Sequence, residues 1–286
     1  MMRVGLRIPG ACGRLPLGDF AAWCKAEGFA AIDLGGADAG RTAAIRGAGM
    51  EVGTYDLPGT GQMLHPDAAQ RRSGVETAMT AINAIADQGG TRAFCVFFPG
   101  HDAGQSRRAS FDNWKEAFPA VAREGEKRGV RIAVEGWPGP NNSALAVTPE
   151  TLRALFDAVP SPAFGINYDP SHLVRVGVDY KRFLDEFGSR VIHAHGKDTA
   201  MDAEALYAYG NLGPTFASAV GFGGGDWRYC IPGEGVVDWP WVCGRLHQAG
   251  FDGFISIELE DFRYNGTESG EKLGLSRARR HLEPFV

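Results

Sequence analysis

The 286-residue sequence predicts an α/β fold in which eight strands and eight helices alternate along the chain. Three observations support this prediction. Short apolar runs rich in β-branched residues are separated by longer stretches with helical periodicity. Several helix-like stretches end at a glycine that a strand follows at once, as at Gly28, Gly129 and Gly250, which is the usual short connection of a βαβ unit. Eight such units in one chain are typical of a closed (β/α)8 TIM barrel, which needs roughly 250 residues.

The elements follow one another in regular order. Strands are expected at residues 3–8, 30–34, 51–55, 93–98, 131–135, 164–168, 191–195 and 254–258. Helices are expected at residues 17–27, 41–48, 67–88, 111–128, 148–158, 179–187, 239–249 and 270–282. In the third helix Val75, Met79, Ile82 and Ile85 recur at helical spacing among polar residues. Thr148 followed by a proline predicts an N-cap with Pro at the first helical position.

The alternation runs through residues 1–286, so we expect a single domain. An open, doubly wound sheet would show a glycine-rich fingerprint after its first strand, whereas IPGACGRLPLG lacks the G-x-G-x-x-G pattern. The longest irregular stretch covers residues 196–238, between the seventh strand and the seventh helix, and is rich in glycine and aromatic residues. A connection of this length in a compact domain is usually functional. We therefore expect a lid over the active-site face.

Composition narrows the class of protein. The net charge is −5 and no run of Lys and Arg forms a basic stripe, which argues against a nucleic-acid partner. The five cysteines are an odd number, widely spaced and without a CxxC pair, which indicates free thiols in a reducing compartment. The start of the chain, MMRVGLRIPG, lacks signal-peptide features, and no apolar run approaches the roughly 20 residues that span a bilayer. We expect a cytoplasmic protein that does not associate with membranes.

Four acidic and histidine residues stand at the ends of four different predicted strands. They are Glu135 in RIAVEGWPG, Asp169 in FGINYDPSH, His195 in VIHAHGKD and Glu258 in FISIELED. In a parallel barrel the carboxyl ends of the strands meet on one face, so these side chains should converge. Three carboxylates and one imidazole suit Mn²⁺, Mg²⁺, Co²⁺ or Zn²⁺, and a divalent cation would relieve the repulsion among the carboxylates. The sequence therefore predicts a metal site on this face.

Other polar residues near these positions allow two interpretations each. His172 follows Asp169 by three residues and either faces the same cavity or bonds to backbone at a helix start. His193 lies one layer below His195 on the same strand, which favours a buried core histidine. Lys197 either contacts substrate or forms a buried ion pair with its neighbour Asp198 that orients the loop.

Further candidates come from the loops at the same end. Arg228, on the long connection, either binds an anionic or hydroxyl-rich end of the substrate or is an exposed loop arginine. Trp137, two residues after Glu135, offers an aromatic face of the kind that sugar sites use. His65 and His101 follow the third and fourth strands, and either line the substrate end of the pocket or cap helices.

Together these motifs resemble the xylose isomerase-like TIM barrels, specifically the sugar phosphate isomerase/epimerase group. That group includes keto-sugar 3-epimerases and hydroxypyruvate isomerases and, more distantly, type-IV apurinic endonucleases. Its members carry a Glu after strand five, D-P-[SG]-H after strand six, H-x-K-D after strand seven and a Glu after strand eight. The matching segments here are VEGWP, DPSH, HGKD and SIELED, and IPGEGVVDWPWV resembles the family's P-G-x-G-x-[VI]-D-W stretch. The resemblance covers the whole chain and is most specific from about residue 130 to residue 262.

The resemblance implies a metal-dependent sugar isomerase or epimerase in carbohydrate metabolism. Glu135, Asp169, His195 and Glu258 would bind one divalent ion, with Mn²⁺ favoured. The two glutamates would also act as an acid/base pair on opposite faces of the substrate carbon. His172 would donate a hydrogen bond to a substrate oxygen that gains charge in the enediolate. The expected partner is a small sugar, and relatives often form homodimers or tetramers.

Three other functions are compatible with the same residues. A lyase or dehydratase could use the site for β-elimination from a 3-keto glycoside or related sugar. An apurinic-endonuclease-like phosphodiesterase is disfavoured, because Asp226-Trp227-Arg228 stands where those enzymes carry an Asp-x-His motif. A non-enzymatic metal or sugar sensor would need only the ligands, whereas this chain also has both candidate acid/base glutamates.

Overall fold

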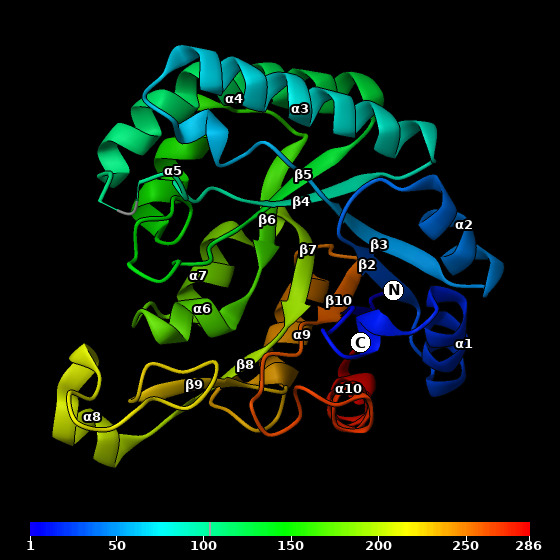
Figure 1. Cartoon of the computed structure of the whole chain (residues 1–286), viewed down its shortest axis with the longest axis vertical. Helices are drawn as coiled ribbons and strands as arrows, with labels where there is room; N and C mark the ends of the chain where they lie inside the picture. Colours follow the sequence, from blue (N-terminus) through cyan, green and yellow to red (C-terminus); the bar gives the residue numbers. More distant parts are fainter. Residues whose placement is uncertain (103) are drawn as a thin grey trace.

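The computed structural model describes residues 1–102 and 104–286, and it contains a closed barrel of eight parallel strands. Going around the barrel, β1 pairs with β2, the strands follow in order to β7, and β10 closes the circle against β1 (Figure 1). The strands are β1 (Arg3–Arg7), β2 (Ala31–Leu34), β3 (Glu51–Asp56), β4 (Arg92–Val96), β5 (Arg131–Glu135), β6 (Phe164–Tyr168), β7 (Val191–Gly196) and β10 (Phe254–Ile257). The predicted (β/α)8 barrel is confirmed, with strand boundaries within two residues of those expected.

Helices connect successive strands and cover the outside of the barrel (Figure 1). They are α1 (Leu17–Glu27), α2 (Ala39–Gly47), α3 (Ala68–Asp87), α4 (Arg107–Arg128), α5 (Pro149–Ala158), α6 (Pro170–Arg175), α7 (Tyr180–Phe187), α9 (Trp239–Gln248) and α10 (Glu268–Leu282). Short 3₁₀ helices lie at Cys12–Arg14, Gln62–Leu64, Gly188–Arg190 and Glu283–Phe285. The expected N-cap of α5 is confirmed, because the Thr148 hydroxyl accepts a hydrogen bond from the amide of Thr151. Gly28, Gly129 and Gly250 all have positive φ, as helix-ending glycines should.

The long connection after β7 contains regular structure that the sequence did not reveal. Two strands, β8 (Asp198–Met201) and β9 (Trp227–Cys230), pair antiparallel, and α8 (Ala203–Tyr209) and a 3₁₀ turn (Gly210–Leu212) lie between them. We call residues 198–230 the hairpin excursion. It projects from the carboxyl end of β7 at the bottom of Figure 1. The expectation of an irregular loop was therefore wrong, and a lid over the active-site face stays a prediction.

A single buried carboxylate ties the start of the hairpin excursion to the segment that follows it. Asp198, the first residue of β8, accepts hydrogen bonds from the amides of Gly233 and Val237, at 3.2 and 3.0 Å, and from the Trp239 indole at 3.1 Å. A side chain at Gly235 would collide with this carboxylate, because a Cβ there would lie 2.1 Å from its oxygen. The start of the excursion is thus tied to the segment by which the chain returns to α9.

The apolar core lies between the strands and the helices, whereas the barrel interior is partly polar. An aromatic cluster of Phe97, Trp114, Phe118 and Phe164 packs between β4, β6 and α4, with ring centroids 4.7 to 6.2 Å apart. Inside the barrel, the fully buried polar side chains include Asp33, Asn167, His193, His195 and Ser256. Buried polar groups need partners, so this interior layer is a place to look for function.

Two expectations from composition can be compared with the structure. All five cysteines are buried and none forms a disulfide, as predicted. None of the helices within residues 1–102 and 104–286 combines the length and the apolar character needed to cross a bilayer.

Candidate metal centre

The four predicted ligand residues meet at the carboxyl ends of four strands. Glu135 is the last residue of β5, Asp169 follows β6 and caps α6, His195 lies in β7, and Glu258 follows β10 directly. The His195 Nδ1 atom lies 2.6 Å from Glu135 Oε1, 3.4 Å from Glu258 Oε2 and 4.0 Å from Asp169 Oδ2. Glu135, Asp169 and His195 are buried, and the Glu258 side chain keeps 18% of its surface exposed. The set is thus gathered at one largely buried point at the carboxyl ends of the strands.

His172 also faces this cluster. Its Nε2 atom lies 3.3 Å from Glu135 Oε2 and 3.5 Å from Asp169 Oδ2, and the ring is buried. Ligand atoms of His172, Glu135, Asp169 and Glu258 all lie within 4.8 Å of one another. The structure agrees with the first interpretation of His172, in which its ring faces the same site as Asp169. The centre therefore offers two imidazoles to one group of carboxylates.

Lys197 places an ammonium group among the carboxylates. Its Nζ atom lies 2.5 Å from Glu258 Oε2, 3.0 Å from Glu260 Oε2 and 3.3 Å from Asp169 Oδ2, and the side chain is buried. The lysine points into the centre while the next residue, Asp198, points to the base of the hairpin excursion. The alternative in which these two neighbours form an ion pair is therefore wrong.

The charges in the centre are strongly coupled. Burial alone would raise the pKa of Glu135 and of Glu258, but His195 beside both carboxylates, and Lys197 beside Glu258, hold those pKa values well below the usual range. Burial alone would lower the pKa of His195, and the two glutamates raise it to about 10 instead. The pKa of Lys197 is raised well above its ordinary value, because Asp169, Glu258 and Glu260 outweigh its burial. With protein groups alone, an imidazolium and an ammonium offset only part of the negative charge of the carboxylates.

The residues fit a divalent cation. Asp169 directs Oδ1 to the amide and hydroxyl of Ser171, at 2.9 and 2.6 Å, which leaves Oδ2 for another partner. Within the described residues, Asp169 Oδ2 and His195 Nδ1 are buried without a hydrogen bond, although ion pairs surround them. Carboxylate oxygens and an imidazole nitrogen are hard or borderline donors that suit Mn²⁺, Mg²⁺, Co²⁺ or Zn²⁺. Buried ligand atoms that converge without hydrogen bonds are compatible with a metal site.

Several residues that orient the candidate ligands escaped sequence reasoning. Asn167 donates to Glu135 Oε1 at 2.7 Å, and Arg7 Nε lies 3.3 Å from Glu258 Oε1. Arg7 is itself held by two parallel hydrogen bonds to Asp56, at 2.9 and 3.0 Å. The signals in the sequence were polar residues inside otherwise apolar strands, but such residues alone do not show which ligand they contact.

The hairpin excursion contributes Tyr229 to the centre. The Tyr229 hydroxyl lies 2.7 Å from His172 Nδ1 and 3.1 Å from Arg175 Nη1, and the residue is buried. Arg175 also stacks on the Trp227 ring, with its guanidinium carbon 4.6 Å from the ring centroid, and donates to the Gly139 carbonyl at 2.7 Å. These contacts fix the hairpin against the ring that faces the carboxylates.

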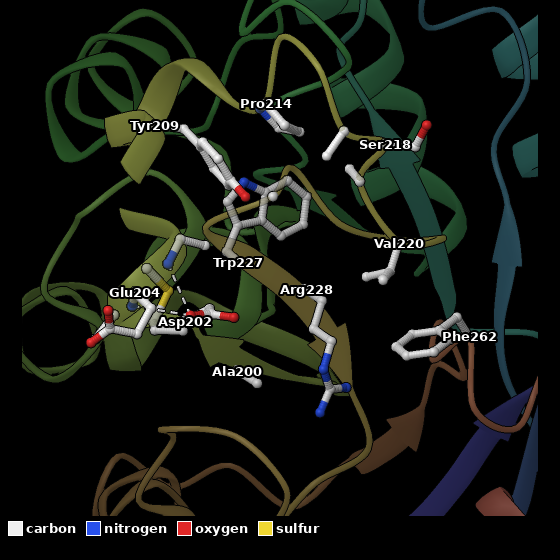
Figure 2. Close-up of a pocket in the computed structure, with 16 residues that line it drawn as sticks. Ala200, Asp202, Glu204, Tyr209, Pro214, Ser218, Val220, Trp227, Arg228 and Phe262 are labelled. Carbon is white, nitrogen blue, oxygen red and sulfur yellow. Dashed lines mark hydrogen bonds between the residues drawn. The ribbon is translucent and has the colours of Figure 1, made fainter. Parts of the chain in front are cut away.

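The remaining predicted substrate residues lie in three different places. Trp137 packs edge-on against Phe98 and lines a cavity of about 790 Å³ that begins at Tyr229 and Glu260. Arg228 lies on the opposite face of β9 from Tyr229, where Figure 2 shows it beside Phe262, and its guanidinium is 3.6 Å from Asp261.

His65 and His101 contact each other instead of the cluster. Their ring centroids are 4.3 Å apart, and His101 Nε2 lies 3.0 Å from Gln105 Oε1. His65 Nδ1 accepts from the amide of Asp67, which is the N-cap of α3. Both histidines follow β3 and β4 as expected, but the structure links them to helix starts and not to the carboxylates.

The fold and the site together define a parallel TIM barrel whose strand ends hold a buried centre of carboxylates and imidazoles. The chain belongs to the xylose isomerase-like TIM barrel family, whose model matches residues 21–284. This confirms the resemblance that the motifs indicated.

Individual sequences and solved structures are also similar to this chain. It is 33% identical to the uncharacterized protein YfiH of Bacillus subtilis over 52% of this chain and 45% of that protein. It is 28% identical to an inosose dehydratase of Geobacillus thermodenitrificans over 52% of this chain and 48% of that protein. The chain thus spans about half the length of these relatives. A solved structure of L-ribulose 3-epimerase superposes with a TM-score of 0.68 at 19% identity, covering 100% of this chain and 93% of that one, which shows the shared fold.

Proposed function

We propose that this protein is a divalent-metal-dependent isomerase or epimerase that acts on a small keto-sugar or sugar derivative. The observation that carries the proposal is the convergence of Glu135, Asp169, His195 and Glu258, from four strands, on one buried point. Three carboxylates in one buried site repel one another unless cations compensate them. A divalent ion bound beside a reacting substrate would supply this compensation.

The ion and the glutamates would divide the chemistry between them. A divalent ion at these four residues would supply the positive charge that makes a C–H bond next to a carbonyl more acidic. Glu135, buried at the end of β5, would remove that proton, and Glu258 would return a proton to the same or a neighbouring carbon. The donor set is compatible with Mn²⁺, our expectation, and equally with Mg²⁺, Co²⁺ or Zn²⁺.

His172 and the hairpin excursion would complete the site. The His172 ring is held between the Tyr229 hydroxyl and the two carboxylates, so its Nε2 atom is aimed at the reaction space. A hydrogen bond from this position would stabilise a substrate oxygen as it gains negative charge. Because Tyr229 belongs to β9, the hairpin both orients this ring and shields it from water.

A β-elimination catalysed by the same centre is the second candidate function. One observation of the structure favours it over a reaction of a small free ketose. The cavity of about 790 Å³ beyond Tyr229, with Trp137 and Trp227 in its wall, lies within the roughly 300–1,000 Å³ range of small-molecule pockets and has room for a substituted sugar. Inosose dehydratases among the sequence relatives support this candidate too.

Proton exchange in D₂O tests the first proposal and separates it from the second. The protein would be loaded with Mg²⁺, which does not broaden spectra, and incubated with a panel of ketoses, inososes and 3-keto glycosides. Deuterium entering next to a carbonyl, with a new stereoisomer or aldose, would support the isomerase or epimerase. Loss of water or release of an aglycone would identify a lyase.

Two variants control the exchange experiment. Glu135→Gln should abolish exchange while the fold is kept, and Glu116→Gln, an exposed glutamate on α4, should not change it. Absence of exchange across the panel, with the ion bound, would contradict both candidate functions. Exchange that survives in Glu135→Gln would remove this residue from the acid/base role.

A further inference from the structure

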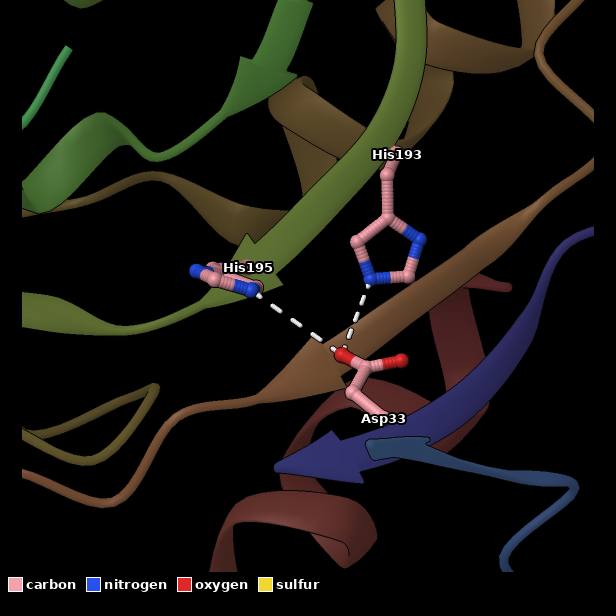
Figure 3. A group of neighbouring side chains, drawn as sticks. All are labelled: Asp33, His193 and His195. Carbon is pink, nitrogen blue, oxygen red and sulfur yellow. Dashed lines mark hydrogen bonds and ion pairs between the residues drawn. The ribbon is translucent and has the colours of Figure 1, made fainter. Parts of the chain in front are cut away.

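Another buried acidic residue lies next to the candidate metal centre. Asp33, in β2, is buried inside the barrel together with His193 and His195 of β7. Its Oδ2 atom lies 3.1 Å from His193 Nε2 and 3.9 Å from His195 Nε2, and Figure 3 shows both rings directed at this one oxygen. Asp33 was not among the residues that the sequence singled out, and the proposed reaction does not use it.

The surrounding strands fix the Asp33 carboxylate in place. Its Oδ1 atom accepts a hydrogen bond of 3.0 Å from the amide of Thr54 in β3. The adjacent residue is Gly53, where a Cβ would lie 2.1 Å from the same oxygen, so only glycine leaves room for the carboxylate. With Oδ1 committed to β3, Oδ2 can only face the two histidines.

His195 presents its two nitrogens to two different carboxylate groups. Nδ1 faces Glu135 and the other predicted ligands, and Nε2 faces Asp33. Within the described residues neither nitrogen makes a hydrogen bond of good geometry, although both are buried. A histidine that ligates a metal through one nitrogen carries a proton on the other, and an acceptor on that side fixes the tautomer and the ring orientation.

We propose that Asp33 is a positioning residue for His195. Its Oδ2 atom keeps the proton of His195 on Nε2 and so leaves Nδ1 available to the carboxylate cluster. His193, whose ring is perpendicular to that of His195 at an interplanar angle of 87°, braces the same oxygen from the other side. The inference rests on the proposed role of His195 as a metal ligand.

The first test uses Asp33→Asn in the full-length protein. Asparagine has nearly the same size and can still accept from the Thr54 amide, but its NH₂ group then faces His195 Nε2 as a donor. We expect Co²⁺ binding, measured by chelator competition, to weaken by about 10- to 100-fold, the usual cost of removing such an orienting partner. Glu271→Gln is the matched control, since Glu271 of α10 is equally buried and hydrogen-bonded but accepts from the amides of Ala11 and Cys12 in the loop after β1. It should lower thermal stability and leave Co²⁺ affinity within about twofold.

The second test needs no variant and remains available if Asp33→Asn does not fold. In the Zn²⁺-loaded wild type labelled with ¹⁵N-histidine, the His195 resonances, assigned with His195→Gln, should show a slowly exchanging proton on Nε2. The metal should be on Nδ1. An exchange rate equal to that of a solvent-exposed imidazole would overturn the inference, as would zinc on Nε2.

The remaining outcomes separate this inference from the proposed function. If the wild type binds no divalent ion, the proposed function itself fails. If it binds one ion and Asp33→Asn binds it equally well, only the positioning role fails. Two ions per chain, with the second lost in Asp33→Asn, would replace the positioning role by direct ligation, since Asp33, His193 and His195 also have metal-ligand spacing.

Discussion

Removing the Lys197 charge should strengthen metal binding, because the ammonium occupies the same carboxylates that the ion would use. In Lys197→Met the side chain keeps its approximate length and loses its three ion pairs, to Glu258, Glu260 and Asp169. A divalent ion that binds Asp169 and Glu258 in the wild type must displace Lys197 from both carboxylates. Lys197 then keeps only its ion pair with Glu260. The variant has no such competition.

The distances set the size of the effect. Two unit charges about 3 Å apart attract by roughly 5–6 kcal/mol at an effective dielectric constant of about 20. Two of the three contacts of Lys197 are at stake, at 2.5 and 3.3 Å. Two effects should cancel most of this attraction. The ammonium can move toward Glu260, and every buried ion pair has a desolvation cost. We expect about 1.4–2.8 kcal/mol to remain, which corresponds to about 10- to 100-fold tighter ion binding.

The assay is chelator competition with Co²⁺ or Mn²⁺ on the metal-free protein, accompanied by thermal unfolding. The metal-free variant should be destabilised by about 3–5 kcal/mol, because buried carboxylates lose their cation, and ion binding should restore much of this loss. Lys181→Met is the control, since Lys181 pairs at 2.7 Å with Asp238 on the surface. Equal or weaker ion affinity in Lys197→Met than in the wild type would refute the reasoning and make the lysine a supporting part of the metal site.

Three further predictions follow from the same geometry. His195→Ala should weaken metal retention, measured by elemental analysis after dialysis, by about tenfold or more, whereas the exposed His247→Ala should not. Full occupancy in His195→Ala would point to His172 or His193 as the ligand. Tyr229→Phe should slow substrate deuterium exchange about tenfold by freeing the His172 ring. Tyr264→Phe, which also loses two hydrogen bonds, should affect only stability, and equal effects of the two variants on exchange would contradict this role. Because the pKa of His195 is raised to about 10, its ring is protonated at neutral pH and must lose a proton to bind an ion. Apparent affinity should therefore rise about tenfold per pH unit between roughly pH 6.5 and 8.5, and a flat profile in titration calorimetry would exclude His195 as the ligand.

Local patterns in the sequence were sufficient for the barrel and for the convergence of its strand-end residues. Each barrel strand and each longer connecting helix leaves a signal within its own residues, and parallel strands necessarily meet at one end. The short helix α6 (Pro170–Arg175) was not predicted. The hairpin excursion was missed because β8 and β9 are four residues long and separated by 25 residues that conceal their pairing. Arg228 was proposed for the substrate side because the sequence does not show which face of β9 each side chain takes. That assignment needs the register of β9 against β8.

The supporting residues of the centre were missed for a different reason. Asp33 meets His193 across 160 positions of sequence, and Tyr229 meets His172 across 57. No local pattern encodes such contacts. A lone carboxylate within the buried strand AIDL was the available signal for Asp33, but its partner could be named only from the closed barrel.

The attachment of the hairpin excursion through Asp198 has a consequence for how this protein can diversify. Since one carboxylate ties the beginning of the excursion to the segment at Gly233 and Val237, the residues between Met201 and Trp227 can change in length and sequence without moving β7 or α9. The residues between β8 and β9 can thus be exchanged as a unit while the barrel strands and helices keep their positions. Replacing the residues between Met201 and Trp227 should alter which molecules reach the candidate metal centre. The candidate acid/base glutamates should keep their positions at the strand ends.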